Sequence, residues 1–350
     1  SVDSGVFVGT FIVPDFKGSD MEITYYESKD AGGNAVSFFD TATVSSAMGS
    51  VSFDRSVYPV PFATKDLRAG DNGLTAQTES GNVTAWITVS DADETNDTLT
   101  TGSTTAAGTI LVKLIETDQT STCFTAGSIA AKSTTDETIV ELGPLAETSG
   151  GSSTYEISVE FDEVLHCGAN MRTITSGDII QVEYVDTADS AGSTSTAYDS
   201  STFDLRTGSL SVDKDVYVLG SDLVVTLTDP DLNLDATSTE TYAMSIIEWD
   251  SDAASSTLLD NTDNSGTFTS NPSSLTETGS DTGVFQTVVT LPESTIGSTT
   301  IKYGEAVTLT YVDVGLSGED TTEADVLDVE AYFSISNFGA LIELDKAVYN

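Results

Sequence analysis

The amino-acid sequence predicts an all-β protein built from repeated domains. Apolar residues come in short alternating runs separated by Ser, Thr and Gly, a composition typical of strands and turns. Two phrases also recur at long spacing. The first phrase is an acidic residue, a basic residue, any residue and then Val-Tyr, and it occurs at residues 54–58, 213–217 and 345–349. The second phrase is Asp-(Ser/Thr)-Gly-Val-Phe followed by an apolar run and Pro, and it occurs at residues 3–14 and 281–292. Such repetition indicates an array of similar domains, which usually serves as a scaffold.

The third repeat shows its elements most clearly. Apolar and polar residues alternate along residues 209–212 and 216–218, which predicts a first strand. A second strand is predicted at residues 223–228, after a turn. The second strand ends at Asp229-Pro230-Asp231, because proline cannot continue a central ladder. Further apolar segments follow at residues 241–249, 283–291, 306–311 and 325–336. About seven strands in about 130 residues fit an immunoglobulin-like β-sandwich.

The second repeat follows the same order and carries an insertion. Residues 179–186 match residues 306–313 of the third repeat. The insertion, around residues 59–79, holds Lys65 and Arg68 in an otherwise acidic chain. These two bases indicate either a contact with an acidic neighbour or a plain loop.

Successive copies of the Val-Tyr phrase are 159 and 132 residues apart, so each repeat is long enough to bury a core of its own. We therefore expect tandem immunoglobulin-like β-sandwich domains, in a window from a longer tandem-repeat protein. The expected segments are residues 1–48, the C-terminal part of one domain; 49–207, a domain with the insertion and a disulfide; 208–338, a further domain; and 339–350, the first strand of the next.

The chain is strongly acidic, with 56 acidic and 12 basic side chains and a formal net charge of −44. Such a surface repels nucleic acids and anionic lipids, whose binding requires Lys and Arg. It either keeps an extracellular or salt-adapted protein soluble or attracts cations. A hydrophobic fraction of 38%, with 12 Tyr and 14 Phe, argues against disorder. No run approaches the roughly 20 apolar residues of a membrane span, and a targeting segment would lie upstream of this window.

Two cysteines, Cys123 and Cys167, fall within the second repeat. In an acidic, Ser/Thr-rich chain of extracellular character we expect them to form a disulfide, the alternative being two buried or free thiols. The bridge would close a loop of about 45 residues and contribute about 3–4 kcal/mol to stability.

Acidic loops follow the second strand of each repeat. Alternating Asp and Asn put oxygen ligands on one side of a turning backbone, as a calcium site requires. In an immunoglobulin-like sandwich the loop after the sixth strand lies at the same pole, which faces the preceding domain. The candidate ligands for Ca²⁺ or another divalent cation are Asp91, Asp93, Asp97, Asp186 and Asp189 in one set, and Asp229, Asp231, Asn233, Asp235 and Asp313 in the other. Asp-rich turns without metal are also common in β proteins.

The sequence does not predict an enzyme. The only histidine, His166, adjoins Cys167, and adjacency in sequence does not make a catalytic pair. There is no Gly-rich phosphate loop and no Cys/His metal spacing. Asn82 and Asn96 begin Asn-x-Thr triplets, the form of N-glycosylation acceptors. Asn82 is the better candidate, because a glycan on Asn96 would compete with the proposed calcium loop.

Several of these phrases together resemble the surface-layer proteins of ammonia-oxidising archaea. They are Asp-(Lys/Arg)-x-Val-Tyr, the strand Val-Thr-Leu-Thr-Asp-Pro-Asp-Leu-Asn at residues 225–233, Asp-Thr-Gly-Val-Phe, and the strand end Tyr-Val-Asp. The resemblance covers essentially the whole sequence. It implies immunoglobulin-like domains in series that self-assemble into a porous two-dimensional lattice of hexagonal symmetry around the cell. It also implies that the acidic charge lines pores and binds cations, including ammonium.

We therefore expect an extracellular, structural surface-layer protein whose partner is itself. A monomeric repeat adhesin or stalk, stiffened by calcium, is the alternative, because the same domains could space a distal binding module from the cell. A secreted enzyme that carries these repeats as accessories is a third hypothesis. Self-assembly into sheets would distinguish the first from the other two.

Overall fold

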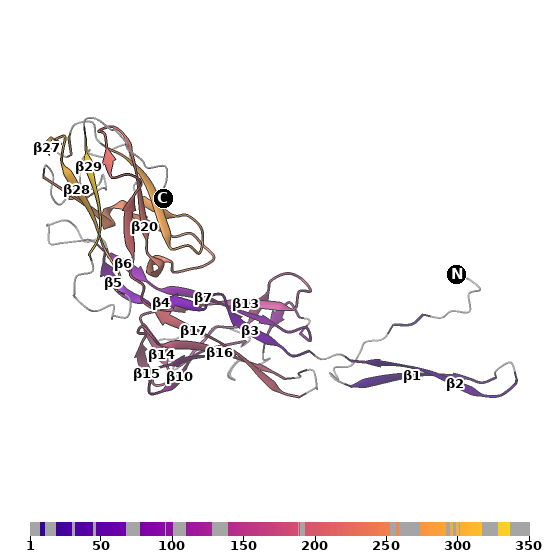
Figure 1. Cartoon of the computed structure of the whole chain (residues 1–350). Helices are drawn as coiled ribbons and strands as arrows, with labels where there is room; N and C mark the ends of the chain where they lie inside the picture. The colour runs from indigo at the N-terminus through magenta and orange to yellow at the C-terminus, as the bar shows by residue number, and fades with distance from the viewer. Residues whose placement is uncertain are drawn as a thin grey trace, which may run out of the picture.

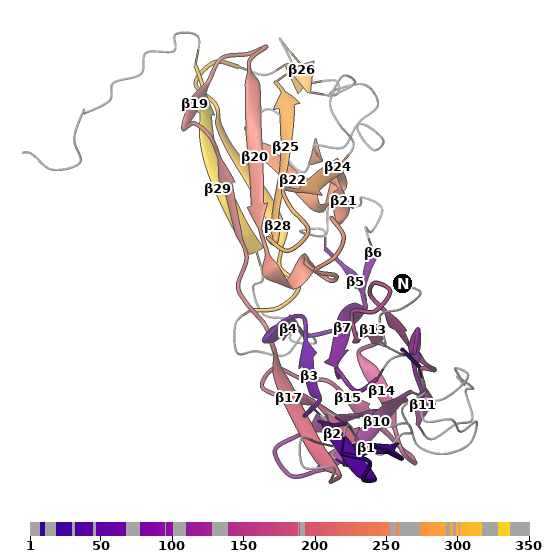
Figure 2. The same ribbon diagram turned by 90° about the vertical axis from the view of Figure 1, so that its right-hand side faces the viewer.

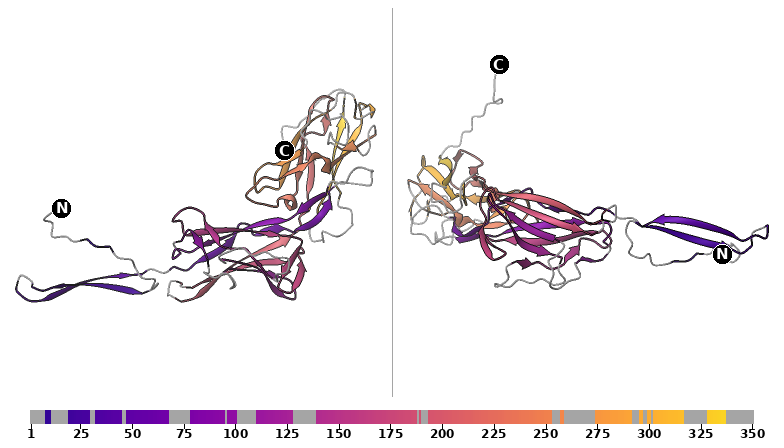
Figure 3. Two further views of the ribbon diagram at one scale, coloured as in Figure 1. Left: turned by 180° about the vertical axis from the view of Figure 1, so that it is seen from behind. Right: turned by 90° about the horizontal axis from the view of Figure 1, so that it is seen from below.

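A computed structural model of the chain consists of strands and turns, with no α-helix among the residues that it describes. These are residues 8–10, 19–29, 32–44, 47–67, 78–94, 96–100, 110–127, 139–187, 189, 193–252, 257–258, 274–291, 295–296, 299–300, 302–316 and 328–336. Figure 1 shows a two-stranded hairpin, a first β-sandwich and a second β-sandwich inclined to the first. The same order is seen from behind and from below in Figure 3.

The first sandwich lies between residues 50 and 204 and has two sheets. One sheet contains, in spatial order, β3 (Ser50–Phe53), β7 (Val83–Ser90), β13 (Thr154–Phe161), β12 (Leu145–Glu147) and β8 (Thr98–Leu99). The other contains β11 (Val140–Glu141), β10 (Thr120–Ala126), β9 (Ile110–Ile115), β16 (Ile179–Asp186), β17 (Ser195–Asp204) and β4 (Val57–Pro59).

The second sandwich lies between residues 209 and 335 and repeats this arrangement (Figure 2). One sheet contains β18 (Ser209–Val212), β20 (Asp222–Thr228), β25 (Val284–Thr290), β24 (Ser274–Glu277) and β21 (Thr241–Ala243). The other contains β19 (Val216–Tyr217), β29 (Asp328–Ile335), β28 (Ala306–Val312), β22 (Ile247–Ser251) and β23 (Thr257–Leu258).

Smaller elements complete the described chain. They are the hairpins β1 (Asp20–Glu27) with β2 (Val36–Thr43), β5 (Phe62–Asp66) with β6 (Thr78–Gly81), β14 (Val164–Cys167) with β15 (Asn170–Thr173), and β26 (Thr295–Ile296) with β27 (Thr299–Thr300), and the 3-10 turns η1 (Pro230–Leu232) and η2 (Met244–Ile246). No helix among the described residues is long and apolar enough to cross a membrane.

Both sandwiches are immunoglobulin-like, since each packs two mainly antiparallel sheets face to face. Their strand order and pairing agree, except that the first sandwich has an additional strand, β11, paired parallel with β10. The first strand of each sandwich switches sheets. β3 and β18 pair antiparallel with β7 and β20, whereas β4 and β19 pair parallel with β17 and β29, the last strands of the two sandwiches. The all-β prediction and the prediction of tandem sandwiches are confirmed.

The recurring Val-Tyr phrase has a structural reason. The Tyr217 hydroxyl donates to Asp213 Oδ1 at 2.6 Å, and that oxygen also accepts the Val224 backbone N–H at 2.8 Å. In the first sandwich Asp54 Oδ1 accepts from the Tyr58 hydroxyl in the same way. Each acid therefore joins the strand after the sheet switch to the second strand of its sandwich. The third copy of the phrase, at residues 345–349, lies outside the described residues.

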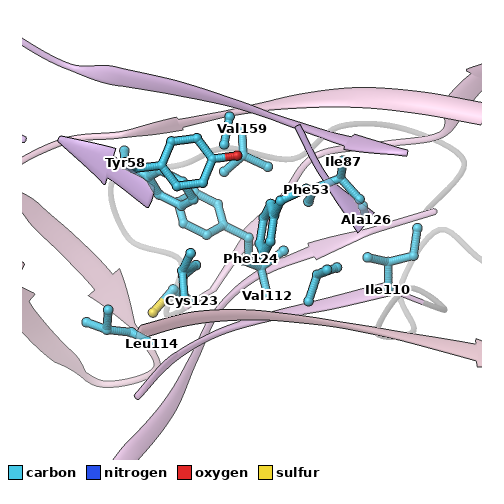
Figure 4. Close-up of a cluster of buried hydrophobic side chains, with 14 of the residues drawn as sticks. Phe53, Tyr58, Ile87, Ile110, Val112, Leu114, Cys123, Phe124, Ala126 and Val159 are labelled. Atoms are coloured by element: carbon cyan, nitrogen blue, oxygen red, sulfur yellow. The ribbon is translucent and has the colours of Figure 1, made fainter. Parts of the chain in front are cut away.

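The first sandwich has a single apolar core filled from both sheets (Figure 4). Residues that alternate along β7 point into this core, which explains its burial pattern of buried and half-buried positions. Tyr58 lies among aromatic rings there, with ring centroids 6.0 Å from Phe53, 6.3 Å from Phe161 and 6.1 Å from Phe203. Each fully buried apolar side chain of this kind contributes about 1.5–3 kcal/mol.

Cys123 on β10 and Cys167 on β14 form a disulfide in the structure. Both are buried, and the bridge ties the β14–β15 hairpin to the sheet that contains β10. The hairpin has no backbone pairing of its own to that sheet, so the covalent link is one of the contacts that fix it.

One expected segment has a different structure from a single strand. The apolar run 241–249 divides between β21 in one sheet and β22 in the other, with the 3-10 turn η2 between them. Met244 and Ile246 of this turn are fully buried in the core. The chain passes from one sheet to the other at η2, and apolar side chains of η2 fill the core there. The alternation of buried and exposed side chains that a single strand would show is therefore absent.

Candidate functional site

Three aspartates from two loops meet at the pole of the second sandwich that faces the first. Asp229 follows β20, Asp231 lies in η1, and Asp313 follows β28. One carboxylate oxygen from each lies within 4.8 Å of the others, and all three residues are buried. Within the described residues this is the one group with the proximity that a metal site needs. We call it the acidic cluster.

Every carboxylate oxygen of the acidic cluster accepts a hydrogen bond from the chain itself. The donors for Asp229 are the Tyr311 hydroxyl at 2.7 Å and the Asp231 backbone N–H at 2.9 Å. For Asp313 they are the backbone N–H groups of Gly208 at 2.6 Å and Gly315 at 3.1 Å. The cluster is therefore a satisfied polar network, as buried polar groups need to be.

Arg206 supplies both donors to the third aspartate. It lies between β17 and β18, the last strand of the first sandwich and the first strand of the second. Its backbone N–H donates to Asp231 Oδ2 at 2.7 Å and its Nε to Asp231 Oδ1 at 3.4 Å, while Nη2 donates to the Pro230 carbonyl at 3.0 Å. The segment that joins the sandwiches is thus bound directly to the acidic loop.

Lys65 is the second cation at the acidic cluster. It lies on β5, in the insertion of the first sandwich, and its ammonium donates to the Val314 carbonyl. Burial lowers the pKa of Lys65 below its ordinary value, although the charges of Asp313 and Asp229 act in the opposite direction and raise it. The two interpretations of Lys65 are therefore resolved in favour of an acidic neighbour, namely the next domain of the same chain. Arg68 lies outside the described residues.

Burial of like charges perturbs the acids themselves. Burial, and then repulsion from Asp313, raises the pKa of Asp229 to about 7. Burial, and then repulsion from Asp229, raises the pKa of Asp231 to about 8, against the lowering by Arg206. Burial also raises the pKa of Asp313. Each carboxylate is thus costly to ionise in this place, even with two cations beside the cluster.

A third basic residue, Arg55, reaches across the same junction. Its Nη1 donates to the Asn233 carbonyl at 2.7 Å and its Nη2 to Asn233 Oδ1 at 2.8 Å. Its Nε lies 3.2 Å from Asp281 Oδ1, and the side chain of Arg55 is only 7% exposed. A guanidinium that binds two groups in its plane fixes their direction as well as their distance.

Backbone and apolar contacts complete the junction. The Thr84 N–H donates to the Leu234 carbonyl at 2.8 Å, and Thr84 forms a parallel bridge with Asp235. Phe62 and Leu67, from the insertion of the first sandwich, are buried in the core of the second. The two sandwiches therefore share main-chain pairing, ion pairs and part of one core.

The first sandwich contains a related network at its corresponding pole. The Tyr184 hydroxyl donates to Asp91 Oδ2 at 2.7 Å, and the Asp93 N–H donates to Asp91 Oδ1 at 3.0 Å. The Gly49 N–H donates to Asp186 Oδ2 at 2.9 Å. Asp93 accepts from the backbone of Ala47, which corresponds to Arg206, so this position supplies no guanidinium. Asp91, Asp93 and Asp186 do not reach the mutual proximity of the acidic cluster.

The other predicted ligands have separate roles. Asp97 is exposed and its carbonyl accepts the Glu147 N–H. Asp189 accepts the Ser193 N–H at 3.0 Å and closes its own loop. Asp235 accepts from the backbone and hydroxyl of Thr237. Asn233 faces Arg55, as described above.

Asn82 and Asn96 both lie at exposed positions. Asn82 donates through Nδ2 to Glu160 Oε1 at 2.7 Å, and the Asn96 carbonyl accepts from the Tyr155 hydroxyl at 2.9 Å. Glycosylation at either position stays a prediction.

The sequence interpretation missed Arg206, the interdomain role of Arg55, and the two glycines at the centre of the networks. A signal for the glycines was present: Gly-Ser-(Val/Leu)-Ser occurs at residues 49–52 and 208–211, just before the first two Val-Tyr phrases. A Cβ on Gly208 would lie 3.3 Å from atoms of both Asp229 and Asp313. Glycine is thus the residue that fits without displacing a neighbour where the backbone passes between two carboxylates.

No protein-family model matches the sequence, and no curated protein matches it. Among solved structures the chain is similar to the Escherichia coli adhesin FdeC, with 16% identity over 83% of this chain and 63% of that chain, and a TM-score of 0.21. This chain thus covers less than two thirds of the FdeC chain.

Two further solved structures show lower similarity. One is a glycosyl hydrolase family 2 member from Bacteroides cellulosilyticus, with 11% identity over 72% of this chain and 24% of that chain, and a TM-score of 0.19. The other is a type II cohesin dyad from the ScaA scaffoldin of Acetivibrio cellulolyticus, with 9% identity over 76% and 88%, and a TM-score of 0.12. Likenesses at this level carry no argument, and the immunoglobulin-like fold follows from the strand pairing and cores described above.

Proposed function

We propose that this chain is part of a structural cell-surface protein, in which immunoglobulin-like domains in fixed orientation build a porous, negatively charged two-dimensional lattice. The recurring phrases that resemble archaeal surface-layer proteins motivate the lattice, its hexagonal symmetry and its archaeal source. Domains in a lattice must keep one mutual orientation, because each contact repeats across the sheet.

The interdomain junction is the observation that carries the proposal. The chain has only 12 Lys and Arg. Arg55, Lys65 and Arg206 all bind at this one junction. Inter-domain motion is the default where an interface is small and polar. Here main-chain bonding and apolar burial accompany the ion pairs, which favours a stiff unit over a flexible linker.

The acidic surface fits a cation-permeable sieve. A net charge of −44 repels anions and enriches cations near the protein. At high ionic strength the Debye length falls to about 3–4 Å, so enrichment of ammonium or metal ions requires carboxylates close to the path of the ion. This part of the proposal concerns surface acids and does not depend on the buried acidic cluster.

A calcium-stiffened adhesin or stalk is the second candidate, because a stiff row of domains also serves to hold a distal module away from the cell. Electron microscopy of the purified full-length protein, in millimolar calcium and after chelation, separates the two. The lattice proposal expects ordered sheets. Separate rods under both conditions would contradict it and favour the stalk.

We also propose that a divalent cation such as calcium binds at Asp91, Asp93 and Asp186, and that it draws these carboxylates closer together than they lie in the structure. Asp91 and Asp186 are each only 2% exposed, and Ala47 stands where Arg206 binds the corresponding aspartate of the second sandwich. The test is thermal melting with and without calcium. The Asp91→Asn/Asp93→Asn variant is expected to lose the stabilisation by calcium that the wild type shows. Equal stabilisation of the variant and the wild type would exclude these ligands.

A further inference from the structure

The acidic cluster contains three carboxylates and receives two positive charges from outside its own sandwich. Arg206 comes from the connecting segment and Lys65 from the insertion of the first sandwich. The six carboxylate oxygens already accept hydrogen bonds from within the chain. An oxygen-ligated divalent ion, which needs six to eight oxygens, would have to displace some of these donors.

Packing and strand pairing restrict the position of the backbone that carries Lys65. Phe62 and Leu67 flank Lys65 in sequence and are buried in the second sandwich, 2% and 0% exposed. The strand that carries Lys65 is paired with β6, with Lys65 opposite Glu79. Burial of Phe62 and Leu67 therefore holds this hairpin against the second sandwich. Lys65 is thus positioned beside the acidic cluster by a packed hairpin and not by a free loop.

The Lys65 ammonium lies where a backbone carbonyl and the charges of the acidic cluster act on it together. It donates to the carbonyl of Val314, the residue directly after Asp313, and both Asp313 and Asp229 act on it electrostatically. A backbone carbonyl and neighbouring carboxylates are also the ligands that hard cations select. Unlike a divalent metal ion, the ammonium carries one positive charge, donates hydrogen bonds and is covalently part of the other domain.

We propose that Lys65 acts as a built-in cation, which takes the place of a divalent ion at the acidic cluster and fastens the first sandwich to the second. Two consequences follow. The orientation of the two sandwiches is independent of calcium, and removal of the ammonium leaves its place at the Val314 carbonyl, beside Asp313 and Asp229, open to a divalent ion. The proposal concerns one chain and holds whether or not the protein forms a lattice, so its failure and that of the proposed function are separable.

The test measures the distance between the sandwiches by pulsed electron spin resonance. Spin labels are placed at Met171→Cys in the first sandwich and Tyr332→Cys in the second, where each native side chain is 63% exposed. The distance distribution is recorded in chelator and in millimolar calcium for four proteins. These are the otherwise wild-type chain, Lys65→Met, Lys65→Arg, and Lys214→Met as a matched control, since the Lys214 side chain is 58% exposed.

The labelled wild type is expected to give one narrow distribution that calcium does not change. Lys65→Met should broaden the distribution in chelator and narrow it again with calcium, whereas Lys65→Arg and Lys214→Met should match the wild type. A wild-type distribution that broadens on chelation would overturn the proposal, because the junction would then depend on a metal. So would a Lys65→Met distribution as narrow as the wild type in chelator.

A second measurement guards against misfolding of Lys65→Met. Titration with Tb³⁺, followed by its tyrosine-sensitised luminescence, is expected to show a site in Lys65→Met that the wild type lacks and that Asp229→Asn abolishes. A strong Tb³⁺ site at the acidic cluster of the wild type, lost on Asp229→Asn, would contradict the proposal. If Lys65→Met does not fold, the response of the wild type to chelator and to Tb³⁺ decides the question.

Discussion

The Tyr311 hydroxyl donates to Asp229 Oδ2 at 2.7 Å, and the same bond joins Tyr184 to Asp91 at 2.7 Å in the other sandwich. Each tyrosine lies on the strand before the last of its sandwich, and each aspartate directly follows the second strand, β20 or β7. The bond therefore ties the two sheets together at the pole that carries the acidic loops. The Tyr–Asp hydrogen bond occurs in both sandwiches, although the basic residues around it differ. It is therefore part of the fold that the two sandwiches share.

Loss of the Tyr311 hydroxyl should destabilise the second sandwich. Tyr311→Phe leaves a buried Asp229 carboxylate with one donor fewer, at a cost of about 1–3 kcal/mol. Urea denaturation followed by Trp249 fluorescence, in chains that carry Trp86→Phe, measures the change, because Trp249 is buried in this core. Tyr198→Phe is the control, since Tyr198 is 58% exposed. Equal midpoints for Tyr311→Phe and the wild type would show that the bond contributes nothing.

Gly49 should not tolerate a side chain. A Cβ there would lie 2.5 Å from Cε1 of Tyr184 and 3.2 Å from Oδ2 of Asp91. We expect Gly49→Ala to cost about 1–3 kcal/mol through overpacking. Gly150→Ala is the matched control, because a Cβ at Gly150 meets nothing within 4 Å. Calorimetric melting of both variants checks the prediction, and equal melting temperatures would contradict it.

The second sandwich should lose stability between about pH 5 and pH 8.5. The pKa of Asp229 is raised to about 7, that of Asp231 to about 8 and, by burial, that of Glu240 to about 7. A carboxyl whose folded-state pKa is raised contributes stability that is present below its unfolded pKa, near 4, and is lost as the pH rises through the folded value. The pKa values of Asp213 and Asp235 are lowered, so these two carboxylates contribute stability that is lost only when the pH falls below this range.

Melting at constant ionic strength across this range measures the effect. The expected result is a melting temperature of the second sandwich that falls with rising pH, and a flatter profile for Asp231→Asn. A melting temperature that rises from pH 5 to pH 8.5 would show that these carboxyls are not held in the protonated form.

Reduction of the disulfide should weaken the first sandwich and spare the second. The bridge between Cys123 and Cys167 spans a sequence separation of 44 residues, for which the chain-entropy model gives about 3–4 kcal/mol. The chain has two tryptophans. Trp86 lies on β7 of the first sandwich and Trp249 on β22 of the second, so each reports on its own sandwich once the other is replaced by Phe. Urea midpoints that do not differ with reductant would contradict the prediction.

The strands were largely predictable, because their signals are local. Alternation along residues 223–228 corresponds to the alternate burial of β20, and Pro230 ends that strand as expected. The convergence of Asp229, Asp231 and Asp313 followed from the topology of an immunoglobulin-like sandwich, since the two loops share a pole. These features need only the period of the side chains and the order of the strands.

The cations of the junction were not predictable in the same way. Lys65 meets Val314 across 249 positions of sequence, and Arg55 meets Asn233 across 178. Such contacts between distant residues produce no periodic pattern in the sequence. In addition, the insertion at residues 59–79 has no counterpart in the third repeat with which it could be compared. The sequence therefore favoured a metal ion at the acidic cluster, where the structure places Lys65 and Arg206.

The two sandwiches should behave in solution as one stiff unit. Small-angle X-ray scattering of the unlabelled chain, in chelator and at moderate salt, measures this. We expect the scattering curve to fit with a single arrangement of the two sandwiches, the second inclined to the first as in Figure 1. A curve that only a broad ensemble of interdomain angles can reproduce would contradict it.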